Sequence, residues 1–108
     1  MSKKNKNLFN TWKEFHKNNP HIWHEFEKRV KSYSRSINTG LNARYIIEEM
    51  RLDWRIKTKD ADGEKLEPYK LPNALTTYYP RYYVYLYPWQ KKLFDFATIK
   101  YPADFDTL

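Results

Sequence analysis

The second quarter of the chain carries an apolar stripe with the period of an α-helix, and this stripe limits the fold more than any other feature. Its members recur every three or four residues and are Ile22, Phe26, Val30, Tyr33 and Ile37. Trp23 lies at the edge of the stripe. Such spacing places them on one helical face. Asn19 suits the N-cap, Pro20 suits the first helical position, and residues 38–40 (NTG) are a stop signal. We expect an amphipathic helix from Pro20 to about Ile37.

Two more segments, one on each side of this helix, show the same period. From Leu8 to Lys17 the apolar stripe consists of Leu8, Trp12 and Phe15, with Phe9 beside it. From about Asn42 to Arg55 it consists of Ala43, Ile46, Ile47, Met50 and Trp54. Tyr45 and Leu52 point away from this last stripe, toward later chain or a partner. The first half of the chain therefore predicts three helices.

A turn signal follows the third helix. The sequence DADG, residues 60–63, lies between short arms at Ile56–Lys59 and Glu67–Leu71, and Pro68 limits the second arm to an edge strand. This pattern predicts a β-hairpin. The expected fold class is mainly α, a small single domain of three to five helices with one short β-hairpin, similar in outline to a winged helix-turn-helix.

The segment from Leu75 to Trp89 contains six tyrosines and a tryptophan. Arg81–Tyr87 fits a strand bounded by Pro80 and Pro88, and it equally fits a short helix that begins at Pro80. Periodicity does not separate these alternatives in so apolar a run. We expect Tyr83 and Leu86, with Tyr82 or Tyr79, to close the core. The remaining tyrosines exceed what this core can bury, so we expect surface positions, suited to a partner, among Tyr78, Tyr85 and Tyr87.

Four stretches carry a resemblance to a known family: NPHIWHEFEK, LNARYIIEEMRLDW, YKLPN and YYPRYYVYLYPWQKKLFDF. In this order they resemble a family of small phage and prophage proteins without assigned activity. The resemblance covers about Phe15 to Phe96. It implies a helix rather than a strand for the paired tyrosines, and it places the protein in the cytoplasm of a host cell.

Length and composition narrow the class of protein. The chain has 108 residues, which is one domain, and no cysteine, which excludes disulfides, thiolate zinc sites and a cysteine nucleophile. No apolar run approaches the roughly 20 residues that span a bilayer, and the start MSKKNKN lacks the apolar segment of a signal peptide. We expect a disordered basic tail (1–7), a helical domain (8–100), an acidic C-terminal tail (101–108) and a cytoplasmic location without membrane contact.

The positive charge is concentrated near the N-terminus. The formal net charge is +7, and residues 1–40 hold nine Lys and Arg against three Glu. Residues 41–70 hold seven basic and seven acidic residues. On the predicted second helix the cations lie opposite the apolar stripe: His24, Lys28, Lys31 and Arg35. This face would attract a polyanion or an acidic protein.

Signals of catalysis and metal binding are weak. His21 and His24 are three residues apart with His16 nearby, but no further ligand has a suitable spacing. With only Gly40 and Gly63, the chain has no glycine-rich phosphate loop. No carboxylate pair or nucleophile lies in a recognisable context. We therefore expect a protein that is not an enzyme, with no cofactor, metal or small-molecule substrate.

Two functional hypotheses remain. The first is an accessory protein of a phage or mobile element that binds nucleic acid or a nucleoprotein through its basic face. The second is a protein-binding inhibitor of a host defence complex, of the anti-CRISPR type, that uses exposed tyrosines. The candidate contacts for both are Lys28, Lys31, Arg35, Arg44, Arg51, Arg55, Lys57, Lys59, Tyr78, Tyr85 and Tyr87. Glu48 lies among the arginines of the third helix, where it can pair with Arg44 or Arg51.

Overall fold

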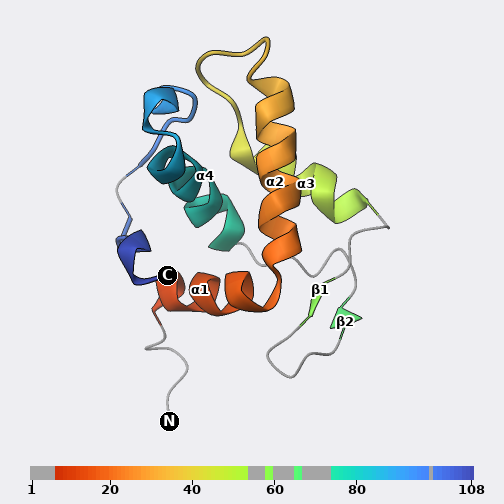
Figure 1. Ribbon diagram of the computed structural model, residues 1–108, viewed down its shortest axis with the longest axis vertical. Coiled ribbons are helices and arrows are strands. Elements are labelled where there is room, and N and C mark those ends of the chain that lie inside the picture. Colours follow the sequence, from red (N-terminus) through yellow and green to blue (C-terminus); the bar gives the residue numbers. More distant parts are fainter. Residues whose placement is uncertain (1–6, 54–57, 60–64, 67–73, 98) are drawn as a thin grey trace.

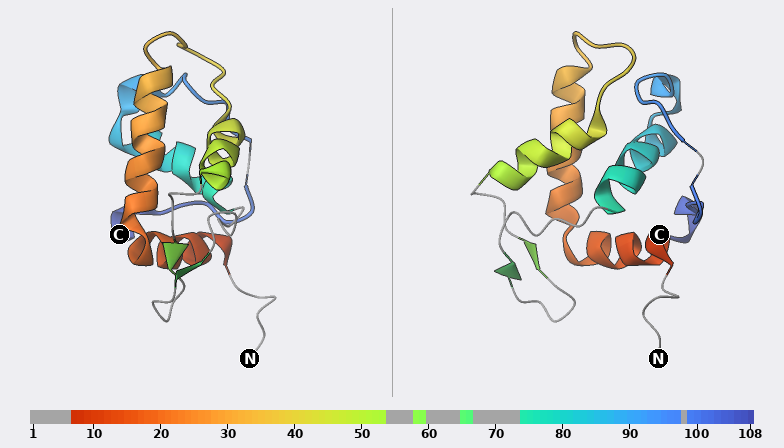
Figure 2. Two further views of the ribbon diagram at one scale, coloured as in Figure 1. Left: turned by 90° about the vertical axis from the view of Figure 1, so that its right-hand side faces the viewer. Right: turned by 180° about the vertical axis from the view of Figure 1, so that it is seen from behind.

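Four α-helices form most of the described chain, which in this computed structural model comprises residues 7–53, 58–59, 65–66, 74–97 and 99–108. They are α1 (Leu8–Asn18), α2 (Pro20–Tyr33), α3 (Ala43–Leu52) and α4 (Ala74–Leu86). Two 3₁₀ turns follow, η3 (Pro88–Gln90) and η4 (Phe105–Thr107). In Figure 1, α1 runs across the foot of α2, and α4 lies beside both. Seen from behind in Figure 2, α3 crosses α2.

The corner between α1 and α2 is built around one buried asparagine. Asn19 is fully buried, and its backbone N–H and its Nδ2 both donate to the Phe15 carbonyl, at 2.9 and 3.2 Å. These bonds end α1, and Pro20 then begins α2 as the sequence predicts. The side chain of Asn19 makes no capping bond to α2. It serves the end of the first helix instead of the start of the second.

The helix predicted from Pro20 to Ile37 ends earlier, at Tyr33. The backbone tightens there, because the N–H groups of Ser36 and Ile37 both donate to the Tyr33 carbonyl, at 3.1 and 3.0 Å. Ile37 nevertheless packs against the core from the turn. The next helix begins where expected, since Asn42 accepts a bond from the Tyr45 N–H at 3.1 Å and caps α3.

The tyrosine segment is helical. α4 begins at Ala74, six residues before Pro80, so this proline lies inside the helix rather than at its first turn. Proline has no N–H to donate to the preceding turn. Burial outweighs this loss, because Tyr78, Tyr79 and Tyr83 are almost completely inaccessible to solvent.

The core lies where α4 meets the first three helices, and it is dominated by aromatic rings. Trp23 contacts Tyr82 with ring centroids 4.7 Å apart, and Phe26 contacts Tyr79 at 5.3 Å. Two expectations about individual residues are wrong. Leu8, expected in the first stripe, is 40% exposed while its neighbour Phe9 is buried, and Leu86 is 38% exposed at the end of α4.

The last residues pack against this aromatic core. Phe105 lies 5.5 Å from Trp12 and 5.2 Å from Tyr82, measured between ring centroids. Tyr78 donates its hydroxyl to the Tyr101 carbonyl at 2.6 Å. The C-terminus therefore lies beside the start of α1 in Figure 1, and residues predicted to form an acidic tail cover part of the core.

The predicted winged-helix fold class is wrong. Strand pairing in the described residues is limited to two residue pairs, between β1 (Thr58–Lys59) and β2 (Lys65–Leu66). The remainder of the predicted arms, including residues 67–71, lies outside the described residues. The tyrosine helix α4 closes the core instead, so the fold needs no sheet: it is a small, mainly helical domain.

Candidate polyanion-binding surface

The predicted cations of the second helix lie on one exposed face. The side chains of Lys28 and Lys31 are 77% and 53% exposed, and Arg35 follows in the exposed turn after α2. His24 belongs to the same face, with its side chain 71% exposed. We call Lys28, Lys31 and Arg35 the α2 row. The expectation that this face points to solvent is confirmed.

Glutamates accompany two of the three cations of the α2 row. Lys28 lies 3.7 Å from Glu25, and Lys31 lies 3.7 Å from Glu27, measured between nitrogen and oxygen. Exposed pairs of this kind contribute at most about 1 kcal/mol and are screened by salt. Arg35 forms no ion pair with any residue that the structure describes. With three cations beside two glutamates, the row keeps a net positive charge.

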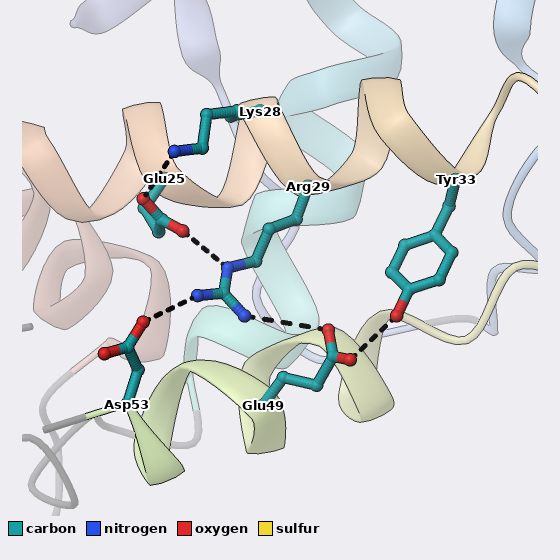
Figure 3. A network of polar contacts seen from close by, with 6 residues as sticks. All are labelled: Glu25, Lys28, Arg29, Tyr33, Glu49 and Asp53. Atoms are coloured by element: carbon teal, nitrogen blue, oxygen red, sulfur yellow. Dashed lines mark hydrogen bonds and ion pairs between the residues drawn. The ribbon is translucent and has the colours of Figure 1, made fainter.

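Arg29 behaves differently from its neighbours on α2. Its guanidinium links α2 to α3, as Figure 3 shows. Its Nε lies 2.6 Å from Glu25, its Nη2 lies 3.0 Å from Asp53, and its Nη1 lies 3.7 Å from Glu49. The side chain of Arg29 is only 20% exposed. This cation is a structural bridge and does not belong to the binding surface.

The same network includes a tyrosine with a strongly shifted pKa. Tyr33 donates its hydroxyl to Glu49 at 2.7 Å, as Figure 3 shows. Losing the hydroxyl proton would place two negative charges side by side. The bond to the Glu49 carboxylate is therefore the main reason that the pKa of Tyr33 is raised to about 12.

Of the cations predicted on the third helix, Arg51 is less suited to binding than Arg44. Arg51 pairs with Glu48 at 2.6 Å, as the spacing predicted, and only 18% of its side chain is exposed. Arg44 is exposed, and it lines a cavity of about 270 Å³ with Arg51, Glu48 and Thr76. Arg55 and Lys57 lie outside the described residues, as does the side chain of Lys59.

The three candidate tyrosines have three different environments. Tyr78 is completely buried, so the expectation that it offers a partner a contact is wrong. Tyr85 is 47% exposed and donates to Asp106 at 2.5 Å. Tyr87 is partly buried, donates its hydroxyl to Glu27, and lies with its ring 4.7 Å from the Lys31 Nζ. The tyrosines do not form one continuous surface.

Trp89 is not among the residues predicted to bind a partner, yet it is the most exposed aromatic side chain described. It is 76% exposed on η3, and its ring lies 5.6 Å from the ring of Tyr87. Lys91 and Lys92 follow it and are also exposed. The run PWQKK, residues 88–92, was the available signal, because it combines a tryptophan with two lysines in a turn. We call Trp89, Lys91 and Lys92 the η3 corner.

A cavity of about 460 Å³ adjoins the η3 corner. Its lining combines residues 89–93 with two polar residues from the turn after α2, Asn38 and Thr39. The two segments are also linked through their backbones, since the Leu41 N–H donates to the Leu93 carbonyl at 2.8 Å. The turn that follows the α2 row therefore lies against the η3 corner.

Other kinds of site find little support. Among the described residues, no three His, Asp or Glu side chains gather closely enough to hold a metal ion. No helix in the same part of the chain is both long and apolar enough to cross a bilayer. Comparisons with known protein families, curated proteins and solved structures give no match. The resemblance to phage proteins therefore stays a prediction, and functional inference depends on this surface.

Proposed function

We propose that this protein is a non-enzymatic nucleic-acid-binding protein, and that its binding surface combines the α2 row with the η3 corner. The observation that carries the proposal is the contact between Lys31 and Tyr87. The Lys31 Nζ lies 4.7 Å from the centre of the Tyr87 ring, and that ring lies 5.6 Å from Trp89. This contact joins two groups of cations, distant in sequence, into one surface, which we call the basic surface.

The charges favour a polyanion as the partner. Five cations belong to the basic surface: Lys28, Lys31, Arg35, Lys91 and Lys92. Three of them, Arg35, Lys91 and Lys92, form no ion pair with a described residue. The pKa of Lys31 is raised, chiefly by its bond with the Tyr87 hydroxyl, although any lysine is already charged at neutral pH. Nucleic acid is the polyanion whose binding such a cluster promotes most directly.

A tyrosine-anchored protein interface receives less support. Tyr78 is inside the core, and Tyr87 uses its hydroxyl and one ring face in contacts with Glu27 and Lys31. Lysine is also depleted in the centres of protein–protein interfaces. Binding to a host protein is therefore the alternative outcome of the experiment below.

The test measures binding of a fluorescent oligonucleotide to a charge-neutralised variant over a range of salt concentrations. In the variant, Lys28, Lys31 and Arg35 are replaced by Gln. Because each lost phosphate contact removes one released counterion, we expect affinity to fall on the order of 10- to 100-fold and the salt dependence to become less steep. The thermal melt should change little, because these side chains are exposed.

The matched control carries the same loss of charge elsewhere. Replacing Lys13, Lys17 and Lys100 by Gln leaves the basic surface intact, and we expect at most a small effect on affinity. An equal loss in the control would contradict a localised surface. Absence of binding by the unaltered protein, in low salt and with single-stranded or duplex ligands, would overturn the proposal. If Arg51→Glu abolishes binding while the first variant binds normally, α3 is the contact instead.

A further inference from the structure

The exposure of Trp89 contrasts with that of the other tryptophans described. Trp12 and Trp23 are 0% and 5% exposed, whereas Trp89 is 76% exposed. An isolated exposed apolar side chain is common and needs no functional explanation. Trp89 differs because the turn that carries it is held by hydrogen bonds and because cations surround it.

The turn that carries Trp89, η3, is held by hydrogen bonds to residues before and after it. Gln90 accepts a bond from the Tyr83 hydroxyl, which lies in the core. The Gln90 N–H donates to the Tyr87 carbonyl at 2.9 Å, and the Leu93 N–H donates to the Gln90 carbonyl at 2.9 Å. Trp89 is therefore presented from an ordered turn, and fixing its backbone on binding a ligand costs little additional entropy.

The surroundings of Trp89 carry positive charge and polar groups. Lys91 and Lys92 are exposed on the same turn, and Lys31 lies over the neighbouring Tyr87 ring. Asn38 lines the adjacent cavity of about 460 Å³, which is large enough to hold part of a nucleotide. An exposed aromatic face beside cations is the arrangement with which proteins bind unpaired nucleotides.

We propose that Trp89 is a stacking platform for an unpaired base, and that the basic surface therefore prefers single-stranded over duplex nucleic acid. Lys91 and Lys92 bind the phosphates next to the stacked base. This inference depends on the proposed function and specifies its ligand. A duplex cannot use the indole face, because its bases are already stacked on one another, whereas a single strand can turn one base onto the ring.

The direct test compares Trp89→Ala and Trp89→Phe with the unaltered protein. The probes are a 20-nucleotide oligo(dT) and a 20-base-pair duplex, both measured by fluorescence anisotropy at one salt concentration. We expect Trp89→Ala to weaken oligo(dT) binding about 5- to 150-fold, the range for loss of one stacked base. Trp89→Phe should recover part of this loss, and duplex binding should change less than twofold.

Two controls separate stacking from charge and from general exposure of aromatic rings. Tyr45→Ala removes a 56% exposed ring from α3, and it should leave oligo(dT) binding unchanged. Replacing Lys91 and Lys92 by Gln should reduce the salt dependence of binding, whereas Trp89→Ala should not, because stacking releases no counterions. Thermal melts verify that all variants are folded.

The failure of this inference can be distinguished from failure of the proposed function. If neither probe binds the unaltered protein, the proposed function fails and the stacking inference fails with it. If both probes bind with equal affinity and Trp89→Ala weakens neither, only the stacking inference is overturned. An equal loss for oligo(dT) and duplex on Trp89→Ala also overturns it, because the ring would then not distinguish unpaired bases.

Discussion

Helix α2 meets α4 and α3 through different chemistry. Toward α4 it offers aromatic rings, and Trp23 and Phe26 lie against Tyr82 and Tyr79 with centroids 4.7 and 5.3 Å apart. Toward α3 its partly exposed edge offers Arg29, which binds carboxylates of that helix and its C-cap at 3.7 and 3.0 Å. The first contact is dry and weakly directional, whereas the second consists of charges near water.

Both of these contacts stabilise the fold, and together they show which side chains of α2 are used inside the molecule and which are left for binding. The aromatic contact removes large apolar surfaces from water, which is the main source of stability in a domain of this size. In the ionic contact, the charge of Arg29 is offset by the carboxylates of α3, so Arg29 is not available to attract a partner. The cations on the exposed face of α2, including Lys28 and Lys31, remain available to a partner.

The largest effect is expected from the apolar contacts. Phe26→Ala and Ile47→Ala should each lower the free energy of unfolding by about 2–5 kcal/mol, because both side chains are completely buried and their removal leaves cavities. Urea denaturation measures the change. Leu86→Ala, at a side chain that is 38% exposed, is the matched control and should cost much less. Equal losses at all three positions would contradict the assigned core.

The next effect is expected at the ionic contact. Arg29→Met should lower the free energy of unfolding by about 2–3 kcal/mol, because Glu25, Glu49 and Asp53 lose the cation that they share. Adding Asp53→Asn should recover part of this loss, since it removes one of the repelling charges. If the losses of the two single variants simply add in the double variant, the two residues are not coupled.

A smaller effect depends on pH. The folded protein raises the pKa of Tyr33 from 10.0 to about 12 through the bond to Glu49. The resulting stabilisation is complete below pH 10 and is lost as pH rises toward about 12, because the unfolded state releases the proton first. The difference in unfolding free energy between the unaltered protein and Tyr33→Phe should therefore shrink across this interval. Urea denaturation at pH 8 to 12 measures it.

The matched background for this pH test is Glu49→Gln, which removes the charge next to Tyr33. In the Glu49→Gln protein, the change in unfolding free energy caused by Tyr33→Phe should vary much less between pH 10 and 12 than it does in the unaltered protein. If the difference shrinks equally in both backgrounds, the bond to Glu49 is not the origin of the raised pKa of Tyr33.

The smallest effect is the response of the two contacts to salt. Raising NaCl from 0.05 to 0.5 M, values chosen to span the range over which screening is strong, should reduce the cost of Arg29→Met by less than about 1 kcal/mol. The cost of Phe26→Ala should stay the same or increase slightly, because apolar burial is not screened. Urea titrations at both salt concentrations measure the two costs. Equal weakening of both would show that the contacts do not differ in chemistry.

Local patterns in the sequence determined three of the helices and most of the inward faces of α2 and α3. Ile22, Phe26 and Val30 were expected to be inside α2, and they are completely buried. Asn42 was expected near the start of α3, and its side chain caps that helix. The cationic face of α2 followed from the same period. These features are predictable because helical periodicity and capping depend on residues within a few positions of each other.

Tertiary structure decided what the tyrosine segment becomes and which charges remain exposed. Pro80 is tolerated inside α4 because Tyr79 and Tyr83 are buried on each side of it. Arg29 is neutralised by α3, while Lys31 meets Tyr87 from beyond α4. Trp89 is exposed because its 3₁₀ turn leaves the ring outside the core, whereas Trp12 is buried on α1. The sequence shows each of these side chains, but burial and partners depend on how separate helices pack, and no local period encodes that packing.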